Sequence, residues 1–216
     1  MTPPDYESDA GTYIDSRLKD ARNGNSQASY EIYARVSSCE RALNPGDADE
    51  YKAYASMGAG AQYSKRVENE IERCKSLINR TDVTSENWLS LAAAQGSIEA
   101  RLMYARDPQA AIGTFTDALT DPNKIIEYRQ NAVSYLNESI RTGNVDSIEA
   151  LANIYSRGII AERSNEKSLS YWLTLQRVNP SDYTSNSIKA LSNQLQPDQI
   201  QRAEIESQEI YRSCCK

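Results

Sequence analysis

Histidine is absent from the 216-residue sequence, and its absence removes several kinds of chemistry at once. A Ser-His or Cys-His nucleophile needs an imidazole as general base, and a His-ligated zinc ion needs one as a ligand. The four cysteines are Cys39, Cys74, Cys214 and Cys215. No two of them form a C-x-x-C pair, so a zinc site would require all four thiolates together. The sequence therefore predicts no catalytic residue, no cofactor-binding residue and no metal ligand of these classes.

Acidic residues cluster at three places and are the remaining candidates for acid–base chemistry or calcium binding. Each cluster lies in a stretch of helical character and is partly interleaved with Lys and Arg, which is typical of a solvated helix face. We therefore assign none of them to catalysis or to a metal. The clusters are Asp47/Asp49/Glu50, Glu68/Glu70/Glu72 and Glu204/Glu206/Glu209.

Two short patterns resemble catalytic motifs but lack their context. Gly58 and Gly60 form a G-x-G with no preceding strand pattern and no lysine at the spacing of a phosphate-binding loop. Glycine in such a place more often serves a tight turn or a close helix crossing. Ser164 precedes Lys167 by three residues, as in a serine nucleophile with a lysine base, but at a predicted loop-to-helix start. The sequence favours a structural role for both patterns.

The overall charge of the chain is acidic. There are 24 Lys and Arg against 30 Asp and Glu, which gives a formal net charge of −6 at pH 7. A nucleic-acid-binding protein needs a basic surface to displace the counterions of phosphates, and attachment to anionic lipid needs the same. No stretch approaches the roughly 20 apolar residues of a membrane-spanning helix. The composition therefore argues against a nucleic-acid partner and predicts no membrane insertion.

Cys39 and Cys74 each fall at helical spacing on an apolar face. Two inward-facing cysteines on neighbouring antiparallel helices predict a disulfide, which is typical of an exported, periplasmic-type protein. Two reduced core cysteines in a cytoplasmic protein are the alternative. The first residues are polar and acidic and show no signal-peptide pattern, so we expect an exported chain to have lost its signal peptide already. The apolar neighbours are Ala28, Ile32, Val36 and Leu43 for Cys39, and Tyr63, Val67, Ile71 and Ile78 for Cys74.

Cys214 and Cys215 are adjacent, and only the first shares a helix face with Ala203 and Ile210. Adjacent cysteines on one helix rarely bond to each other, because the geometry is strained. Pairing elsewhere in the chain, or with a part of the protein outside this sequence, stays open.

The sequence predicts that the cysteines, acidic clusters and short motifs described above all lie on helices or in the turns between them. Alternation of β-branched residues is missing, and helix-start signals are frequent. Asp107-Pro108 and Asp121-Pro122 each look like an N-cap followed by proline in the first turn. Further starts are predicted at Asn179-Pro180, at Gln196-Pro197 and, as a capping box, at 47–50. We expect helices near residues 8–22, 26–43, 47–57, 62–79, 85–95, 97–106, 108–119, 122–141, 145–157, 165–177, 181–194 and 197–213.

Small and aromatic residues recur at fixed spacing in several of these helices. An aromatic residue and a small pair four residues later lie on one helix face, and a glycine then ends that helix. Small residues at i and i+4 of the next helix let the two backbones approach closely. The pattern predicts a repeated helical hairpin. It is carried by Trp88, Ala92, Ala93, Gly96 and Ala100, by Tyr135, Gly143, Leu151, Ala152, Tyr155, Gly158 and Tyr171, and more faintly by Ala21, Gly24, Ala28 and Ile32.

This spacing resembles the Sel-one-like repeat (SLR), one of the tetratricopeptide-like helical-hairpin families. Residues 85–178 carry the resemblance, residues 14–40 carry it weakly, and the rest hardly at all. Two departures stand out: Ile160-Ala161 replaces the Gly-Val of the family, and residues 106–129 interrupt the middle repeat. The resemblance implies an all-α fold, a right-handed superhelical solenoid of antiparallel helical hairpins. We expect one domain over 1–216, with divergent helices at 8–80, clear repeats at 85–178 and capping helices at 181–213.

The resemblance also implies a function. Solenoids of this kind present a concave surface to a peptide or a partner protein, so we expect a non-enzymatic scaffold or adaptor without cofactors, in a bacterial envelope process. The alternative is a weak hydrolase or small-ligand binder, because some cysteine-rich exported relatives are linked to β-lactam binding. Those relatives carry a cysteine pair in each repeat, whereas residues 85–178 contain no cysteine.

Overall fold

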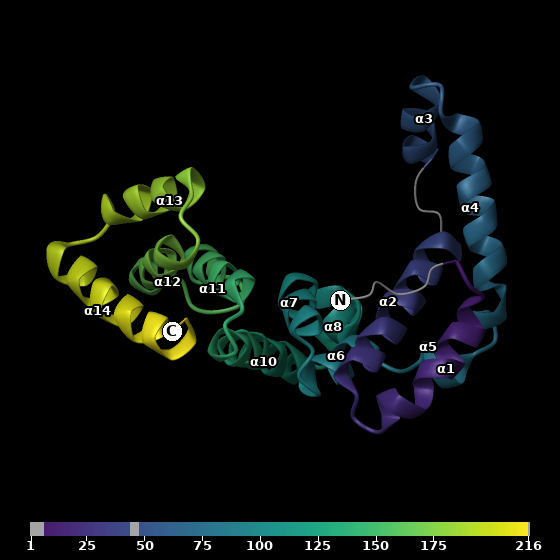
Figure 1. The fold of residues 1–216 in the computed structure, drawn as a ribbon, viewed down its shortest axis with the longest axis horizontal. Helices are drawn as coiled ribbons and strands as arrows, with labels where there is room; N and C mark the ends of the chain where they lie inside the picture. The colour runs from purple at the N-terminus through teal and green to yellow at the C-terminus, as the bar shows by residue number, and fades with distance from the viewer. Residues whose placement is uncertain (1–6, 44–47, 216) are drawn as a thin grey trace. The chain divides into compact units, whose positions relative to one another are not determined.

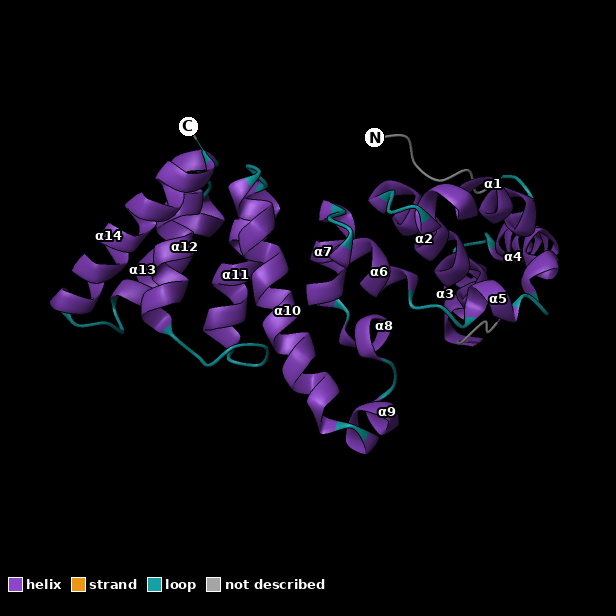
Figure 2. Ribbon diagram, turned by 90° about the horizontal axis from the view of Figure 1, so that it is seen from below, coloured by secondary structure: helices purple, strands orange, loops and turns teal. Residues whose placement is uncertain are grey.

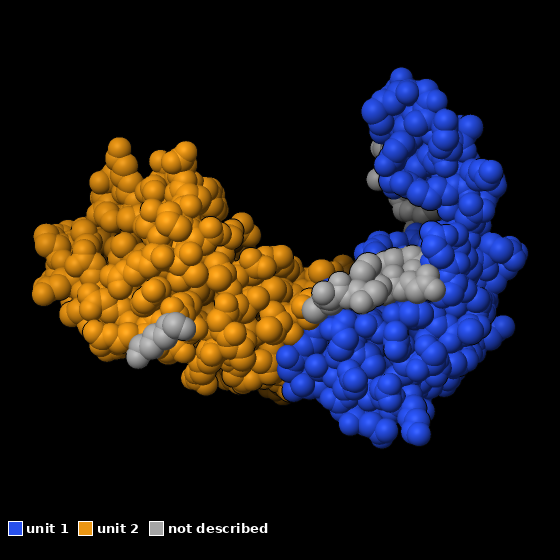
Figure 3. Space-filling view, viewed as in Figure 1, with its two compact units in different colours: residues 1–97 blue, residues 98–216 orange. Residues whose placement is uncertain are grey.

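The computed structural model describes residues 7–43 and 48–215, and all regular secondary structure in these residues is helical. The chain forms two compact units, residues 1–97 and residues 98–216 (Figure 3). The prediction of an all-α fold is thereby confirmed for the described ranges. None of the helices in them combines the length and the apolar composition needed to cross a bilayer. The expectation of a single domain over 1–216 stays a prediction.

The first unit consists of helical hairpins around one apolar core. α2 packs against α1, α4 and α6, while α3 packs against α4 as a hairpin of its own (Figure 1). Ile14, Ile32 and Val83 are fully buried, and the ring nitrogen of Trp88 donates a hydrogen bond to the Val83 carbonyl at 2.8 Å. The elements are α1 (Ala10–Arg22), α2 (Ser26–Leu43), α3 (Ala48–Ser56), α4 (Gly60–Cys74), the 3-10 turn η1 (Lys75–Leu77), α5 (Thr81–Thr84) and α6 (Trp88–Ala94).

The second unit packs its long helices side by side (Figure 2). α11 contacts α12, α12 contacts α13 and α14, and α10 contacts both α7 and α11. Leu136, Leu151 and Leu169 are fully buried among these helices, and each contributes about 1.5–3 kcal/mol of hydrophobic free energy. The elements are α7 (Ile98–Arg106), α8 (Pro108–Ile112), α9 (Phe115–Thr120), α10 (Pro122–Arg141), α11 (Val145–Arg157), α12 (Asn165–Val178), α13 (Asp182–Ser192) and α14 (Pro197–Cys214).

Four helices end with the same glycine turn. Gly24, Gly58, Gly96 and Gly143 have φ values of +93°, +76°, +102° and +86°. In each turn the N–H of the residue after glycine donates to the carbonyl five residues earlier, at 2.9–3.1 Å. This is the Schellman motif, in which an otherwise unpaired carbonyl of the last helical turn gains a partner. The recurrent glycines of the sequence pattern are therefore turn residues, and the tight turn expected at Gly58 is confirmed.

The helix predicted over 108–119 is interrupted, and this prediction is wrong. α8 ends at Ile112 and α9 begins at Phe115. Gly113 between them has φ = +90°, a backbone conformation that stops an α-helix at that residue. The two Asp-Pro starts are confirmed, because Asp107 and Asp121 both accept N-cap hydrogen bonds from backbone N–H groups.

Other predicted boundaries shift by a few residues. The helix expected over 85–95 is α6, which begins at Trp88, and the short α5 before it was not predicted. The helix expected over 62–79 ends at Cys74 and continues as η1. The start expected at Asn179-Pro180 lies two residues later, because Ser181 is the N-cap of α13. The start at Gln196-Pro197 is confirmed as a capping box. The capping box expected at 47–50 depends on side chains outside the described part of the chain.

Gly158→Ala is expected to destabilise the protein more than Gly143→Ala. Gly158 caps α11 in the left-handed region (φ +73°), and a Cβ there would lie 2.8 Å from the Cβ of Arg163. At Gly143 the nearest atom to a new Cβ, the Cys214 carbonyl oxygen, is 3.7 Å away. Gly143→Ala therefore meets backbone strain alone, about 1 kcal/mol, while Gly158→Ala adds steric overlap and costs about 2–3 kcal/mol. Urea unfolding of both variants measures the difference, and equal losses would contradict it.

Candidate functional site

The second unit contains a groove of about 990 Å³, which we name the α8–α11 groove. Its walls come from the end of α7, from α8, α10 and α11, and from the loop that follows α11. This volume lies at the upper end of the range of small-molecule sites. The lining residues are Ala105, Arg106, Pro108, Gln109, Ile112, Gly113, Thr114, Ile125, Tyr128, Arg129, Glu149, Ala150, Asn153, Ile154, Arg157, Ile159 and Ile160.

Helical spacing explains why these side chains face one space. Ile125, Tyr128 and Arg129 stand at positions i, i+3 and i+4 of α10, so they share one face of that helix. On α11, every fourth residue from Glu149 to Arg157 lines the groove, again on a single face. The groove is therefore built on two long helices, which hold their side chains more firmly than loops do.

Tyr128 forms part of the groove floor and is itself buried. Its hydroxyl donates to the Ala105 carbonyl at 3.2 Å, which gives a partner to one of the last carbonyls of α7. Its ring contacts that of Tyr104 at a centroid distance of 5.3 Å. Burial raises the pKa of Tyr128 to about 12, so the phenol stays protonated and remains a hydrogen-bond donor at neutral pH.

The groove is positively charged although the chain is acidic. Three arginines and one glutamate line it, against the net charge of −6 for the whole sequence. Nε of Arg129, at 3.0 Å, and Nη2 of Arg129 both donate to the Ile159 carbonyl, which ties the loop after α11 to α10. Arg106 and Arg157 are exposed, and neither forms an ion pair with a described residue.

The remaining lining is largely aliphatic and partly open to water. Ile159 is 71% exposed and Ile125 is 36% exposed, while Ile154 is buried. Among the described lining residues there is no serine, cysteine, lysine or aspartate, and Glu149 is the single carboxylate. A nucleophile with its base would require at least two such groups within hydrogen-bonding distance. The described lining thus combines aliphatic side chains with three arginines.

None of the twelve residues that we took as the repeat signature lines the groove. Most of them are buried between helices, among them Trp88, Ala92, Leu151 and Tyr171, and the Tyr155 ring stacks on that of Tyr171 at 5.8 Å. The groove residues themselves were missed by the sequence analysis. A signal was present in the sequence, however, because nine of the seventeen lining residues fall in segment 106–129, which interrupts the predicted repeat, and Ile160 is one of the predicted departures from it.

Ser164 and Lys167, the pair considered for a serine nucleophile, have structural contacts. The Ser164 hydroxyl accepts a hydrogen bond from the backbone N–H of Lys167 at 3.2 Å and caps α12. The Lys167 ammonium lies 5.1 Å from the centre of the Tyr155 ring. Both side chains therefore stabilise the start of a helix and its contact with α11.

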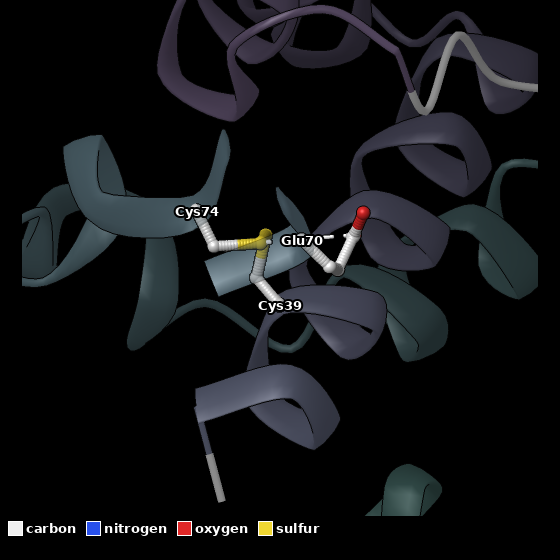
Figure 4. A group of neighbouring side chains, drawn as sticks. All are labelled: Cys39, Glu70 and Cys74. Atoms are coloured by element: carbon white, nitrogen blue, oxygen red, sulfur yellow. Dashed lines mark hydrogen bonds between the residues drawn. A yellow bond between two sulfur atoms is a disulfide. The ribbon is translucent and has the colours of Figure 1, made fainter. Parts of the chain in front are cut away.

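Cys39 and Cys74 form a disulfide, with their Cα atoms 5.4 Å apart (Figure 4). The Glu70 carboxylate lies beside them, and the three side chains together have the composition of a small metal site. Sulfur atoms joined in a disulfide offer no thiolate to a metal ion. Glu70 also accepts hydrogen bonds from Arg35 at 2.9 Å and from Ser38 at 3.1 Å. This cluster therefore holds α2 to α4.

Glu70 and Arg35 correct the expectation of a solvated acidic face. Glu68 and Glu72 are exposed, but the Glu70 side chain is only 21% exposed and pairs with Arg35, whose side chain is fully buried. Arg35 also donates to the Ser8 carbonyl at 2.9 Å. The signal in the sequence was a basic residue within the apolar stripe of α2, one turn after Ile32.

Cys214 and Cys215 are joined to each other in the structure, with Cα atoms 3.7 Å apart at the end of α14. This differs from the expectation that adjacent cysteines rarely pair. No described cysteine is free.

The geometry defines an all-α protein built of helical hairpins, with the α8–α11 groove on its second unit. No protein-family model and no curated protein matches the sequence. A solved structure that it resembles is the protective antigen c5321 of uropathogenic Escherichia coli, described as displaying an SLR fold. The identity is 18% and the TM-score 0.38, over 93% of this chain and 49% of that one. This chain thus spans about half the length of the antigen.

Proposed function

We propose that this chain is a non-enzymatic interaction module of the SLR type, which binds a partner protein or peptide in the α8–α11 groove. The observation that carries the proposal is the position of the departures from the repeat. Segment 106–129 and Ile160 disturb the hairpin pattern, and both line the groove. Residues that serve only the packing of a solenoid would be expected to follow the repeat.

The exposed aliphatic side chains support the same role. Ile159 and Ile125 leave apolar area in contact with water in the groove that Arg106 and Arg157 also line, and neither arginine forms an ion pair with a described residue. Apolar area concentrated in a concave surface and surrounded by polar groups is typical of a binding site. The disulfide between Cys39 and Cys74 supports an exported, periplasmic-type location in a bacterium, because such bonds persist mainly in oxidising compartments.

The test compares Ile159→Asp with Ile205→Asp in affinity capture from an envelope extract. Both isoleucines are exposed, 71% and 52%, but Ile205 on α14 does not line the groove. We expect a partner that the unaltered protein and Ile205→Asp retain and that Ile159→Asp releases. Circular dichroism of both variants serves as the control for folding. Retention of every captured protein by Ile159→Asp would contradict the proposal.

Binding of a small molecule is the second candidate, because the groove volume of about 990 Å³ also suits a drug-sized ligand. A β-lactam that raised the melting temperature of the protein, with the rise lost in Ile159→Asp, would favour this candidate. Hydrolysis of the β-lactam above background, lost in Ile159→Asp, would further make the protein an enzyme.

A further inference from the structure

The charge of the α8–α11 groove restricts what it can bind. Arg106 and Arg157 are exposed and without ion pairs among the described residues, and the Arg129 guanidinium is already oriented by the Ile159 carbonyl. A guanidinium presents a planar set of donors that matches a carboxylate with two parallel hydrogen bonds. Three such groups around one groove, on a chain of net charge −6, favour an anionic ligand at this place.

The apolar part of the groove restricts the ligand further. Ile112, Ile125 and Ile154 lie within it, and Ile159 stands exposed beside them. Burying an aliphatic side chain against this surface removes apolar area of both partners from water. The ligand that satisfies both parts carries acidic groups around an aliphatic side chain.

Single-stranded nucleic acid and other dense polyanions fit the groove less well than an acidic peptide. Bases of single-stranded nucleic acid stack on exposed aromatic rings, but Tyr128, the aromatic residue of the groove, is only 5% exposed. A dense polyanion would also meet Glu149 in the wall formed by α11. For a peptide the same carboxylate is useful, because it can accept a hydrogen bond from a backbone N–H.

We propose that the α8–α11 groove binds a short acidic peptide segment of a partner protein, with carboxylates on Arg106, Arg129 and Arg157 and an aliphatic side chain on the isoleucines. This inference rests on the proposed function and adds the chemistry of the partner to it. Affinity then falls as salt rises, because the ion pairs form near the protein surface.

The experiment uses fluorescence anisotropy with a labelled synthetic peptide in which one leucine is flanked on both sides by glutamates. Arg157→Glu is expected to weaken binding about tenfold or more, the effect of losing one charge-assisted hydrogen bond. Arg141→Glu is the matched control, because Arg141 is likewise exposed in the last turn of its helix but lies outside the groove. Ile125→Ala is expected to weaken binding several-fold, and its neighbour Ile126→Ala, 55% exposed and outside the groove, is not.

Further ligands separate failure of this inference from failure of the proposed function. If the peptide with lysines in place of glutamates binds as tightly in the groove, the inference is wrong and the interaction module stands. The inference is also wrong, and the interaction module again stands, if the glutamate peptide shows no saturable binding while Ile159→Asp still loses its captured partner. If anionic vesicles or an oligonucleotide bind in a way that Arg157→Glu abolishes and no peptide binds, both proposals are wrong.

Discussion

Replacing Cys39 and Cys74 together by alanine is expected to lower the free energy of unfolding by about 3–4 kcal/mol. The disulfide closes a loop between positions 35 residues apart and joins the end of α2 to the end of α4. Without it the unfolded chain gains the conformational freedom of that loop, while the folded state loses only two small buried groups. Urea unfolding of the oxidised protein and of the double variant measures the difference.

The control for this prediction is the double replacement of Cys214 and Cys215 by alanine. These residues are adjacent, so their bond closes no loop of the chain, and we expect a change within about 0.5 kcal/mol. Reductant should lower the free energy of unfolding of the unaltered protein by about as much as the replacement of Cys39 and Cys74 does. Titration of free thiols in denaturant completes the test: four free thiols in protein isolated from its native host would contradict both the disulfide and the proposed export.

Glu70→Ala is expected to cost about 3–5 kcal/mol of folding free energy, toward the lower end because water reaches part of the Glu70 side chain. The carboxylate is 2.9 Å from Nη1 of Arg35, whose side chain is fully buried, so its removal leaves a buried cation without that counter-charge. The Ser38 hydroxyl loses its acceptor at the same time.

Two further variants test whether the buried charge is the cause. Glu72→Ala, on the same helix and exposed, removes only a surface ion pair with Lys75 and should change stability by less than about 0.5 kcal/mol. Replacing Arg35 and Glu70 together by methionine should recover much of the loss, because no unpaired charge then remains inside. The prediction fails if Glu70→Ala is no more destabilised than Glu72→Ala in the same urea titration.

Most helices and their turns could be predicted because the information that determines them is local. Asp121-Pro122 starts α10 through a side-chain cap and a fixed φ angle, both of which are visible in two adjacent residues. The helical spacing of Cys39 and Cys74 made their pairing predictable as well. Gly113 carries a local stop signal as well, because glycine readily adopts the positive φ that ends α8, but the prediction of one helix over 108–119 did not use it.

The groove and the Arg35–Glu70 pair could not be predicted, since each depends on which helices meet. Segment 106–129 appeared in the sequence only as an interruption, and nothing local shows that Arg106, Arg129 and Arg157 converge on one space. Glu70 lies among other acidic residues, and only the packing of α2 against α4 distinguishes it from Glu68 and Glu72. Local patterns thus predict elements, and the site requires their tertiary arrangement.

The two Asp-Pro helix starts have a practical consequence for protein engineering. Asp107 caps α8 and Asp121 caps α10. The stretch between them is therefore flanked by two helix starts that are stabilised by local hydrogen bonds, without a contact from another helix. The fully buried leucines of the second unit lie outside this stretch, in α10, α11 and α12. An exchange of residues 108–114 should therefore leave both helix starts intact, provided that a small residue is kept at Ala111, which is buried in α8, the helix that contacts α7 and α10.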